Sequence, residues 1–240
     1  MISRFERGSS SDAGSWALYF ASLGIRVAPA FEVDHQGRCG CLNSACRRPG
    51  KHPLFQEDWS TASTDTAQIK SWWRRRPSAN LLVQTGSRSK LLVIDADTRA
   101  GGIRSLEALQ ERFCELRNSF LVRSGSGGRH VYLHTSRRWR SGTDSVCSGI
   151  DVRGEGGYVI GPGSHHFSGV RYTAESLRPI LPVGAELESH LRQIGVGGPV
   201  SQKNARTRKE PSDRPVETAL GNRSPALMDE LGKPIPPVGR

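Results

Sequence analysis

The sequence predicts a mixed α/β protein, and three observations support this prediction. Apolar residues at helical spacing mark several helices, and short apolar runs bounded by glycine mark strands. Helices and strands follow one another irregularly, which fits neither an all-β protein nor a regular β–α–β series. The 240 residues could form one large domain or two small ones, with enough material for a buried core.

Local signals predict the elements of the first half. A helix from about residue 12 to residue 23 places Trp16, Phe20 and Leu23 on one face, and Gly24 suits the position after its end. The run "IRVAPA" predicts a short strand. The segment "STASTDTAQIKSWWRRRP" begins with capping residues and stops at a proline, which predicts a second helix. The runs "NLLVQTG" and "LLVIDAD" predict two strands separated by the turn-like "SRSK".

The second half is richer in strands. One helix is marked by apolar residues at helical spacing: Ile103, Leu106, Leu109, Phe113 and Leu116. The runs "SFLVRS", "HVYLHT", "GIDVRG", "GYVIGPG" and "VRYTAE" predict strands, and "GAELESHLRQIG" predicts a last helix. We therefore expect a folded domain over residues 12–196, a flexible N-terminus over 1–11, and a disordered tail over 197–240 that is rich in glycine, proline and charge.

The charge of the chain favours a polyanionic partner. Its formal net charge is +11. A positive charge of this size favours binding to nucleic acid, but it can also simply keep the protein soluble. No apolar run approaches the ~20 residues needed to cross a bilayer, so we expect no membrane association. The first residues lack the apolar region of a signal peptide, which predicts a cytoplasmic protein whose five cysteines form no disulfide framework.

Three of these cysteines lie close together in "CGCLNSACRRPGKH" and indicate a metal site. With one histidine they form the pattern C-x-C-x4-C-x5-H: Cys39, Cys41, Cys46 and His52. These ligand types suit tetrahedral Zn²⁺, although the gap between the first two cysteines is shorter than usual, and His35 is an alternative ligand. We expect a structural zinc loop over about residues 35–53 that presents Lys51 to phosphate or, as a solvated cation, to water.

A second candidate site begins in "LLVIDADTRAGG". On a strand, residues two apart point to the same face, so Asp95 and Asp97 can face one cleft together. Oxygen ligands suit Mg²⁺ or Mn²⁺, which would neutralise the pair and bind substrate phosphates. Alternatively, these aspartates cap the helix that begins near Gly101 or start a turn.

The segment "RSGSGGRHVYLH" joins a glycine-rich turn to a strand. Glycines let a backbone approach a ligand closely and offer N–H groups to phosphate. Arg129 and His130 would then complete a phosphate site at the rim. The alternative interpretation is a hairpin turn followed by a histidine with an ordinary structural partner.

The segment "SGIDVRGEGGYVIGPGSHHFSG" supplies further polar residues. Asp151 could be a third metal carboxylate, and Arg153, on the same strand face, could contact phosphate. Ser164 and His166 follow in a glycine-rich loop. The alternative for Asp151 is a hydrogen bond to a neighbouring backbone turn.

Taken together, these segments resemble one known family. The stretches "TASTDTAQIKSWWRRRPSANLLVQTGSRSKLLVIDAD", "SGSGGRH" and "GIDVRGEGGYVIGPGSHHFSG" are similar in order and spacing to the bifunctional DNA primase/polymerase (prim-pol) domain. That domain belongs to the archaeo-eukaryotic primase superfamily, and the resemblance covers roughly residues 12–180. It implies an α/β primase-polymerase fold, with an RRM-like catalytic sheet, a smaller α/β lobe and a zinc-binding loop.

The resemblance also implies roles for individual residues. Asp95, Asp97 and Asp151 would be the metal-binding catalytic carboxylates, and His130 would contact the phosphates of the incoming nucleotide. Ser164 and His166 match the family's Ser-x-His turn, here preceded by "GPG" where the family more often has two prolines. Many relatives carry a Cys-rich insert ending in Gly-Lys-His-Pro, which matches "GKHP" in this chain.

The expected function is that of a template-dependent nucleotidyltransferase, a primase and DNA polymerase of a plasmid, phage or integrated element. Its partners would be a single-stranded DNA template and nucleoside triphosphates, and its cofactors Mg²⁺ or Mn²⁺ as well as Zn²⁺. Larger relatives carry a helicase after this domain, so a helicase would act in trans or be missing through truncation. Two rival functions are a non-catalytic DNA-binding replication module with a degenerate nucleotide site and a metal-dependent nuclease.

Overall fold

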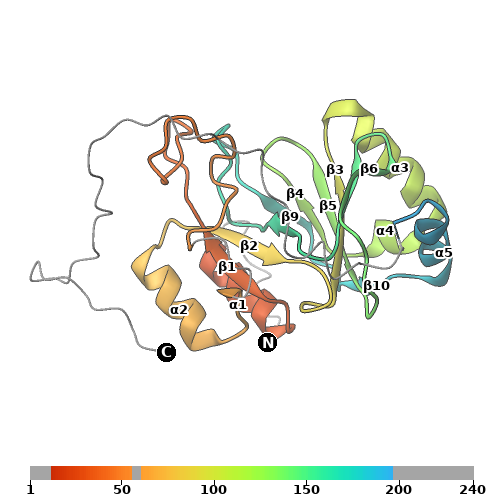
Figure 1. The fold of residues 1–240 in the computed structure, drawn as a ribbon, viewed down its shortest axis with the longest axis horizontal. Helices are drawn as coiled ribbons and strands as arrows, with labels where there is room; N and C mark the ends of the chain where they lie inside the picture. The colour runs from red at the N-terminus through yellow and green to blue at the C-terminus, as the bar shows by residue number, and fades with distance from the viewer. Residues whose placement is uncertain (1–11, 56–60, 197–240) are drawn as a thin grey trace, which may run out of the picture. The chain divides into compact units, whose positions relative to one another are not determined.

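The computed structural model describes residues 12–55 and 61–196 of the chain (Figure 1). The expectations for the N-terminus (1–11) and the tail (197–240) lie outside these residues. Within the described part, helices and strands follow one another irregularly and build two sheets. The predicted mixed α/β class is therefore confirmed.

The first two described helices, α1 (Ala13–Ser22) and α2 (Thr66–Arg75), begin at capping side chains. They are followed by the 3₁₀ turn η2 (Arg99–Gly101), α3 (Gly102–Arg112), α4 (Cys114–Asn118) and α5 (Ala185–Gln193). The carboxylate of Asp12 accepts the N–H of Ser15 at the start of α1, and Asp65 accepts the N–H groups of Ala67 and Gln68 at the start of α2. None of the described helices has the length and apolar character needed to span a bilayer.

The strands form one small and one large sheet. The small sheet joins β1 (Val27–Ala30), β2 (Asn80–Gln84) and β8 (Tyr158–Ile160) in antiparallel order. The large sheet has the order β6-β7-β3-β5-β4-β9, with bounds Gly142–Cys147, Ile150–Arg153, Leu91–Ala96, Arg129–His134, Leu121–Arg123 and Thr173–Ser176. The short β10 (Leu181–Pro182) pairs in parallel with the end of β5. Strand β3 thus lies in the middle of the large sheet, between β5 and β7.

Each face of the large sheet covers a separate core. On β3, Leu91 and Val93 join the core that contains α1, α2 and the small sheet, whereas Leu92 and Ile94 join the core with α3, α4 and α5 (Figure 1). Because strand residues alternate between faces, Asp95 continues the face that is directed toward the small sheet. The candidate site therefore lies on the sheet face opposite α3, α4 and α5.

Two elements differ from the sequence-based expectation. The helix expected through Leu116 is broken at Phe113, whose extended backbone (φ −115°, ψ 99°) separates α3 from α4. Phe113 and Leu116 are nevertheless buried in the same core, and for this reason the apolar spacing in the sequence continues across the break. Strand β6 was not expected, because "GTDSVC" lacks alternating apolar residues and pairs with β7 through an irregular register.

The cap of α2 provides a stability prediction. Replacing Asp65 with Ala removes the acceptor of two N–H groups and should lower the free energy of unfolding by about 1 kcal/mol. Urea denaturation followed by circular dichroism measures this change. Asp65→Asn is the matched control and should retain most of the stability, so equal losses in both variants would contradict a capping role.

Candidate functional site

Three of the predicted site residues lie in one row across the large sheet. Asp95 on β3 is paired with His130 on β5 on one side and with Asp151 on β7 on the other. Directly opposite residues of antiparallel strands have Cα atoms about 4.5–5.5 Å apart and point to the same face. The register of the central strands therefore brings together residues from three separate motifs.

Arg153 links the two paired carboxylates. Its Nε and Nη2 donate to Asp95 Oδ2 at 3.1 and 3.0 Å, and Nη2 also donates to Asp151 Oδ2 at 2.6 Å. On the other side of Asp95, His130 Nε2 lies 3.4 Å from Oδ1. Because one guanidinium nitrogen contacts both carboxylates, the two groups are close enough to share a cation. Their hard oxygen ligands are of the kind that Mg²⁺ and Mn²⁺ prefer.

Asp97 follows the end of β3, and its hydrogen bonds stabilise the turn that comes next. Its N–H donates to the carbonyl of Gly149, and its carboxylate accepts the N–H and the guanidinium of Arg99, each at 3.0 Å. Partial burial alone would raise the pKa of Asp97, but the hydrogen bonds from Arg99 outweigh it and lower that pKa. Asp97 thus starts a turn, as the alternative interpretation expected. Its role as a metal ligand stays a prediction.

Arg129 is directed away from this row. It is paired with Ala96 next to His130, and successive strand residues point to opposite faces. Its guanidinium contacts Glu175 on β9 at 3.1 Å and Glu107 on α3 at 3.7 Å. The structure therefore does not bring Arg129 to the phosphate site expected beside His130.

Lys51, on the Cys-rich loop, lies within electrostatic range of the row. Hydrogen bonds hold its backbone on both sides, since Asn80 Nδ2 donates to the carbonyl of Gly50 at 3.0 Å and Tyr158 Oη donates to that of Lys51 at 2.7 Å. Burial lowers the pKa of the Lys51 ammonium, while the charges of Asp95 and Asp97 oppose this shift. A cation is thus held within the electrostatic field of the carboxylates.

The loop after β8 brings Ser164 and His166 to the same side. The buried hydroxyl of Ser164 accepts the N–H of Leu81 at 2.9 Å, which ties the loop to β2. His166 is also buried, and its Nδ1 lies 2.9 Å from the hydroxyl of Ser168. Among the described residues, no group forms a hydrogen bond with His166 Nε2. This nitrogen is therefore buried and unpaired within the described part of the chain.

Tyr172 connects the two histidines, although the sequence did not single it out. Its ring centroid lies 6.0 Å from that of His130 and 6.0 Å from that of His166. Burial, and to a lesser extent the charge of Asp95, raises the pKa of the Tyr172 phenol. In the sequence, Tyr172 is one aromatic residue of a strand pattern, and only the tertiary structure reveals its position between the histidines.

The environment of His166 predicts a pH dependence of stability. Burial, with a smaller contribution from the positive charge of Lys51, lowers the pKa of His166 from 6.5 to about 4. The unfolded chain therefore takes up this proton first, and stability should fall as the pH decreases from about 6.5 to about 4. NMR titration should show a neutral His166 at pH 6. His166→Asn should reduce the pH dependence of stability, and titration of His166 near pH 6.5 would contradict the prediction.

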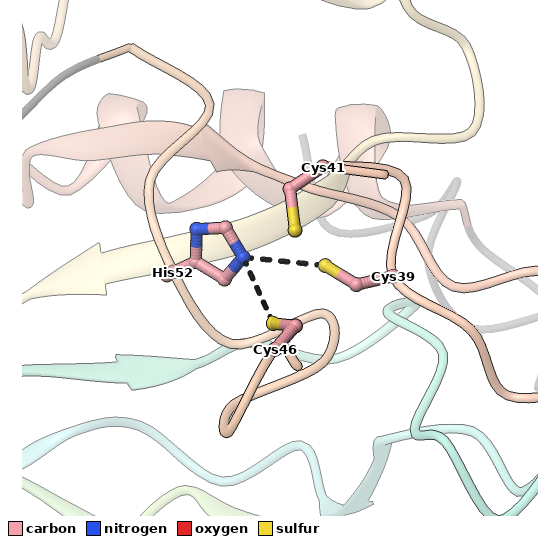
Figure 2. A group of neighbouring side chains, drawn as sticks. All are labelled: Cys39, Cys41, Cys46 and His52. Atoms are coloured by element: carbon pink, nitrogen blue, oxygen red, sulfur yellow. Dashed lines mark hydrogen bonds between the residues drawn. The ribbon is translucent and has the colours of Figure 1, made fainter. Parts of the chain in front are cut away.

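The predicted zinc ligands converge in the loop that carries Lys51 (Figure 2). The ligand atoms of Cys39, Cys41, Cys46 and His52 all lie within 4.8 Å of one another. His52 Nε2 is 3.2 Å from the sulfur of Cys39 and 3.5 Å from that of Cys46. Ligands of a tetrahedral zinc ion are separated by about 3.5–3.8 Å, so the cluster could hold Zn²⁺. Among the described residues, His35 does not belong to this group.

The protonation of the cluster favours metal binding at His52 and opposes it at Cys39. Burial raises the pKa of the Cys39 thiol to about 11, and burial together with Arg48 lowers the pKa of His52. His52 is therefore a neutral imidazole at pH 7, the form that binds metal. Cys39 would have to lose its proton on binding Zn²⁺, which makes the affinity for zinc dependent on pH.

Comparison with known protein families identifies a match that covers most of the chain. The family described as "Bifunctional DNA primase/polymerase, N-terminal" matches residues 17–185, more than two thirds of the chain. This range includes both the row around Asp95 and the Cys-rich loop. No curated protein matches the sequence significantly. The chain belongs to the bifunctional DNA primase/polymerase family, of which it carries the N-terminal domain.

Proposed function

We propose that the protein is a template-dependent nucleotidyltransferase that starts and extends DNA primers on single-stranded template. Family membership implies primase/polymerase-type chemistry in general. The more specific proposal rests on the row formed by His130, Asp95 and Asp151, which combines carboxylates with a histidine beside the cation of Lys51. The resemblance to domains of plasmids, phages and integrated elements supports a role in the replication of such an element, in the cytoplasm.

The carboxylates provide the charge that the reaction requires. Two divalent cations, Mg²⁺ or Mn²⁺, would activate the attacking 3′-hydroxyl and stabilise the departing pyrophosphate. Asp95 and Asp151 are the residues to hold them, because both already contact one cationic group, and Asp97 would complete the set from the adjoining turn. With little covalent chemistry left to the protein, positioning and charge account for most of the rate.

The surrounding residues would bind the triphosphate. Lys51 and Arg153 supply positive charge on this face of the sheet. Burial lowers the pKa of His130, so this residue would act as a neutral hydrogen-bonding group, and its Nδ1 has no partner among the described residues. His166 offers a second such nitrogen. Ser164 would contribute indirectly, by fixing the loop that carries His166.

Primer synthesis and primer extension test this proposal directly. The native chain is incubated with single-stranded DNA, labelled nucleoside triphosphates and Mg²⁺ or Mn²⁺, with and without an annealed primer. We expect labelled products longer than the primer, and new primers in its absence, that disappear with a chelator. DNA binding without any product would favour the non-catalytic module, and shortened DNA would favour the nuclease.

A further inference from the structure

Phe167 is an exposed aromatic residue beside the candidate phosphate site. Its exposed fraction is 51%, so it belongs to neither of the two buried cores. The ring packs against that of His166, with centroids 4.1 Å apart and an interplanar angle of 39°. The ammonium of Lys51 lies 5.9 Å from the Phe167 ring centroid. The ring is thus supported from within the site and remains half accessible.

The backbone around Phe167 is held in place. His166 and Val170 are joined by a hydrogen bond of 2.9 Å, and Gly169 donates to the carbonyl of His166 at 2.9 Å, which closes a tight turn. On the other side, Gly37 lies so close that a Cβ atom there would collide with the carbonyl of Phe167. Gly37 belongs to the turn before Cys39, so the Cys-rich loop packs directly against Phe167. A ring held in this way loses little freedom when it binds a ligand.

Cationic residues lie on the segments that meet at the exposed ring. Arg171 acts electrostatically on His165, and Arg48 acts on His52, so positive charge lies on both segments that meet at Phe167. The imidazole of His166 packs against the ring, and the ammonium of Lys51 lies 5.9 Å from the ring centroid. A planar apolar surface bordered by cations is the combination that binds single nucleotides and unpaired bases.

We propose that Phe167 is a stacking platform for a nucleobase whose phosphates are bound by the neighbouring cations. The base belongs either to the incoming nucleoside triphosphate or to the single-stranded template, and the same ring chemistry serves both. This inference rests on the proposed function and adds to it a residue for base binding.

Binding experiments with matched ligands test the proposal. Calorimetry compares thymidine triphosphate with inorganic tripolyphosphate, and fluorescence anisotropy compares an oligothymidylate with an abasic oligonucleotide of equal length. Phe167→Leu should weaken binding of one or both base-containing ligands roughly tenfold, and should leave both base-free ligands unaffected. Phe167→Trp should retain the affinity. Val170→Ala is the matched control, because Val170 lies in the same turn and is also 51% exposed.

The outcomes separate this inference from the proposed function. A loss confined to thymidine triphosphate would assign the incoming base to Phe167, and a loss confined to oligothymidylate would assign a template base. Equal losses for base-containing and base-free ligands, or none at all, would overturn the inference without contradicting the proposed function. Base-dependent binding in a chain that synthesises no product would retain Phe167 as a platform but overturn the proposed function. If the native chain binds none of these ligands, both proposals are wrong.

Discussion

Replacing Asp95 with Asn should abolish primer extension, with a decrease in rate of roughly 10³–10⁴-fold. Asp95 is the centre of the row, since it pairs with both His130 and Asp151 and accepts two hydrogen bonds from Arg153. Asparagine keeps the shape of the side chain but removes its negative charge, so cations would be held more weakly. Incorporation of labelled nucleotide at saturating Mg²⁺ measures the loss.

A carboxylate of the same sheet that lies outside the row provides the control for this variant. Glu175 on β9 contacts Arg129 on the face opposite the row, so Glu175→Gln removes a paired charge without affecting Asp95. It should retain most of the activity. Thermal unfolding and DNA binding should show that Asp95→Asn is still folded. Substantial primer extension by Asp95→Asn would overturn the catalytic role of the row. An equal loss of primer extension in Glu175→Gln would show that removing any carboxylate charge from the sheet has this effect.

The sequence predicted those parts of the site that depend on local pattern. The apolar run before Asp95 defines a strand, and period-two alternation places Asp95 on one face of it. The cysteine spacing defines a metal cluster, and the ligand atoms do converge. The capping residues Asp12 and Asp65 define two helix starts. In each case the determining interactions lie within a few residues of one another.

The remaining parts depend on pairing between distant segments. That Asp151 and His130 flank Asp95 follows from the register of β7 and β5 against β3, which no local pattern determines. The positions of Tyr172 and Phe167 likewise depend on the path of the loop after β8. Without the resemblance to a known family, the three motifs could not have been assigned to one site.

The direction in which Arg129 points could have been predicted from the sequence. The phosphate-site interpretation treated Arg129 and His130 as neighbours at the rim of a turn. Both belong to β5, however, and consecutive residues of a strand cannot point to the same face. Once "RHVYLH" is recognised as a strand that begins at Arg129, only one of the two residues can face Asp95.

Removing zinc should weaken nucleotide binding as well as loosen the Cys-rich loop. Cys39 and His52 flank the segment that carries Lys51, and the N–H of Gly50 lies 3.4 Å from the sulfur of Cys39. Replacing Cys39 with Ser should therefore abolish stoichiometric zinc binding and disturb the position of Lys51. Loss of one charge-assisted contact to phosphate should lower the affinity for nucleoside triphosphate by about tenfold or more. Metal analysis and calorimetry measure the two effects.

The other cysteines provide the control for the zinc variant. Cys114 is exposed on α4 and does not belong to the cluster, so Cys114→Ser should keep both the zinc and the nucleotide affinity. In Co²⁺-substituted protein, the absorption of tetrahedral thiolate coordination should be present in Cys114→Ser and absent in Cys39→Ser. A native chain purified without stoichiometric zinc, and unable to bind Co²⁺ in this form, would contradict the zinc site.

A double change distinguishes the route by which zinc acts. If the cluster supports nucleotide binding by positioning Lys51, removing zinc from Lys51→Ala should lower the affinity little further, because the contact is already lost. Additive losses would mean that the loop acts through another contact, such as its packing against Phe167. An unchanged affinity in the zinc-free native chain would show that the hydrogen bonds from Asn80 and Tyr158 hold Lys51 in place without the metal.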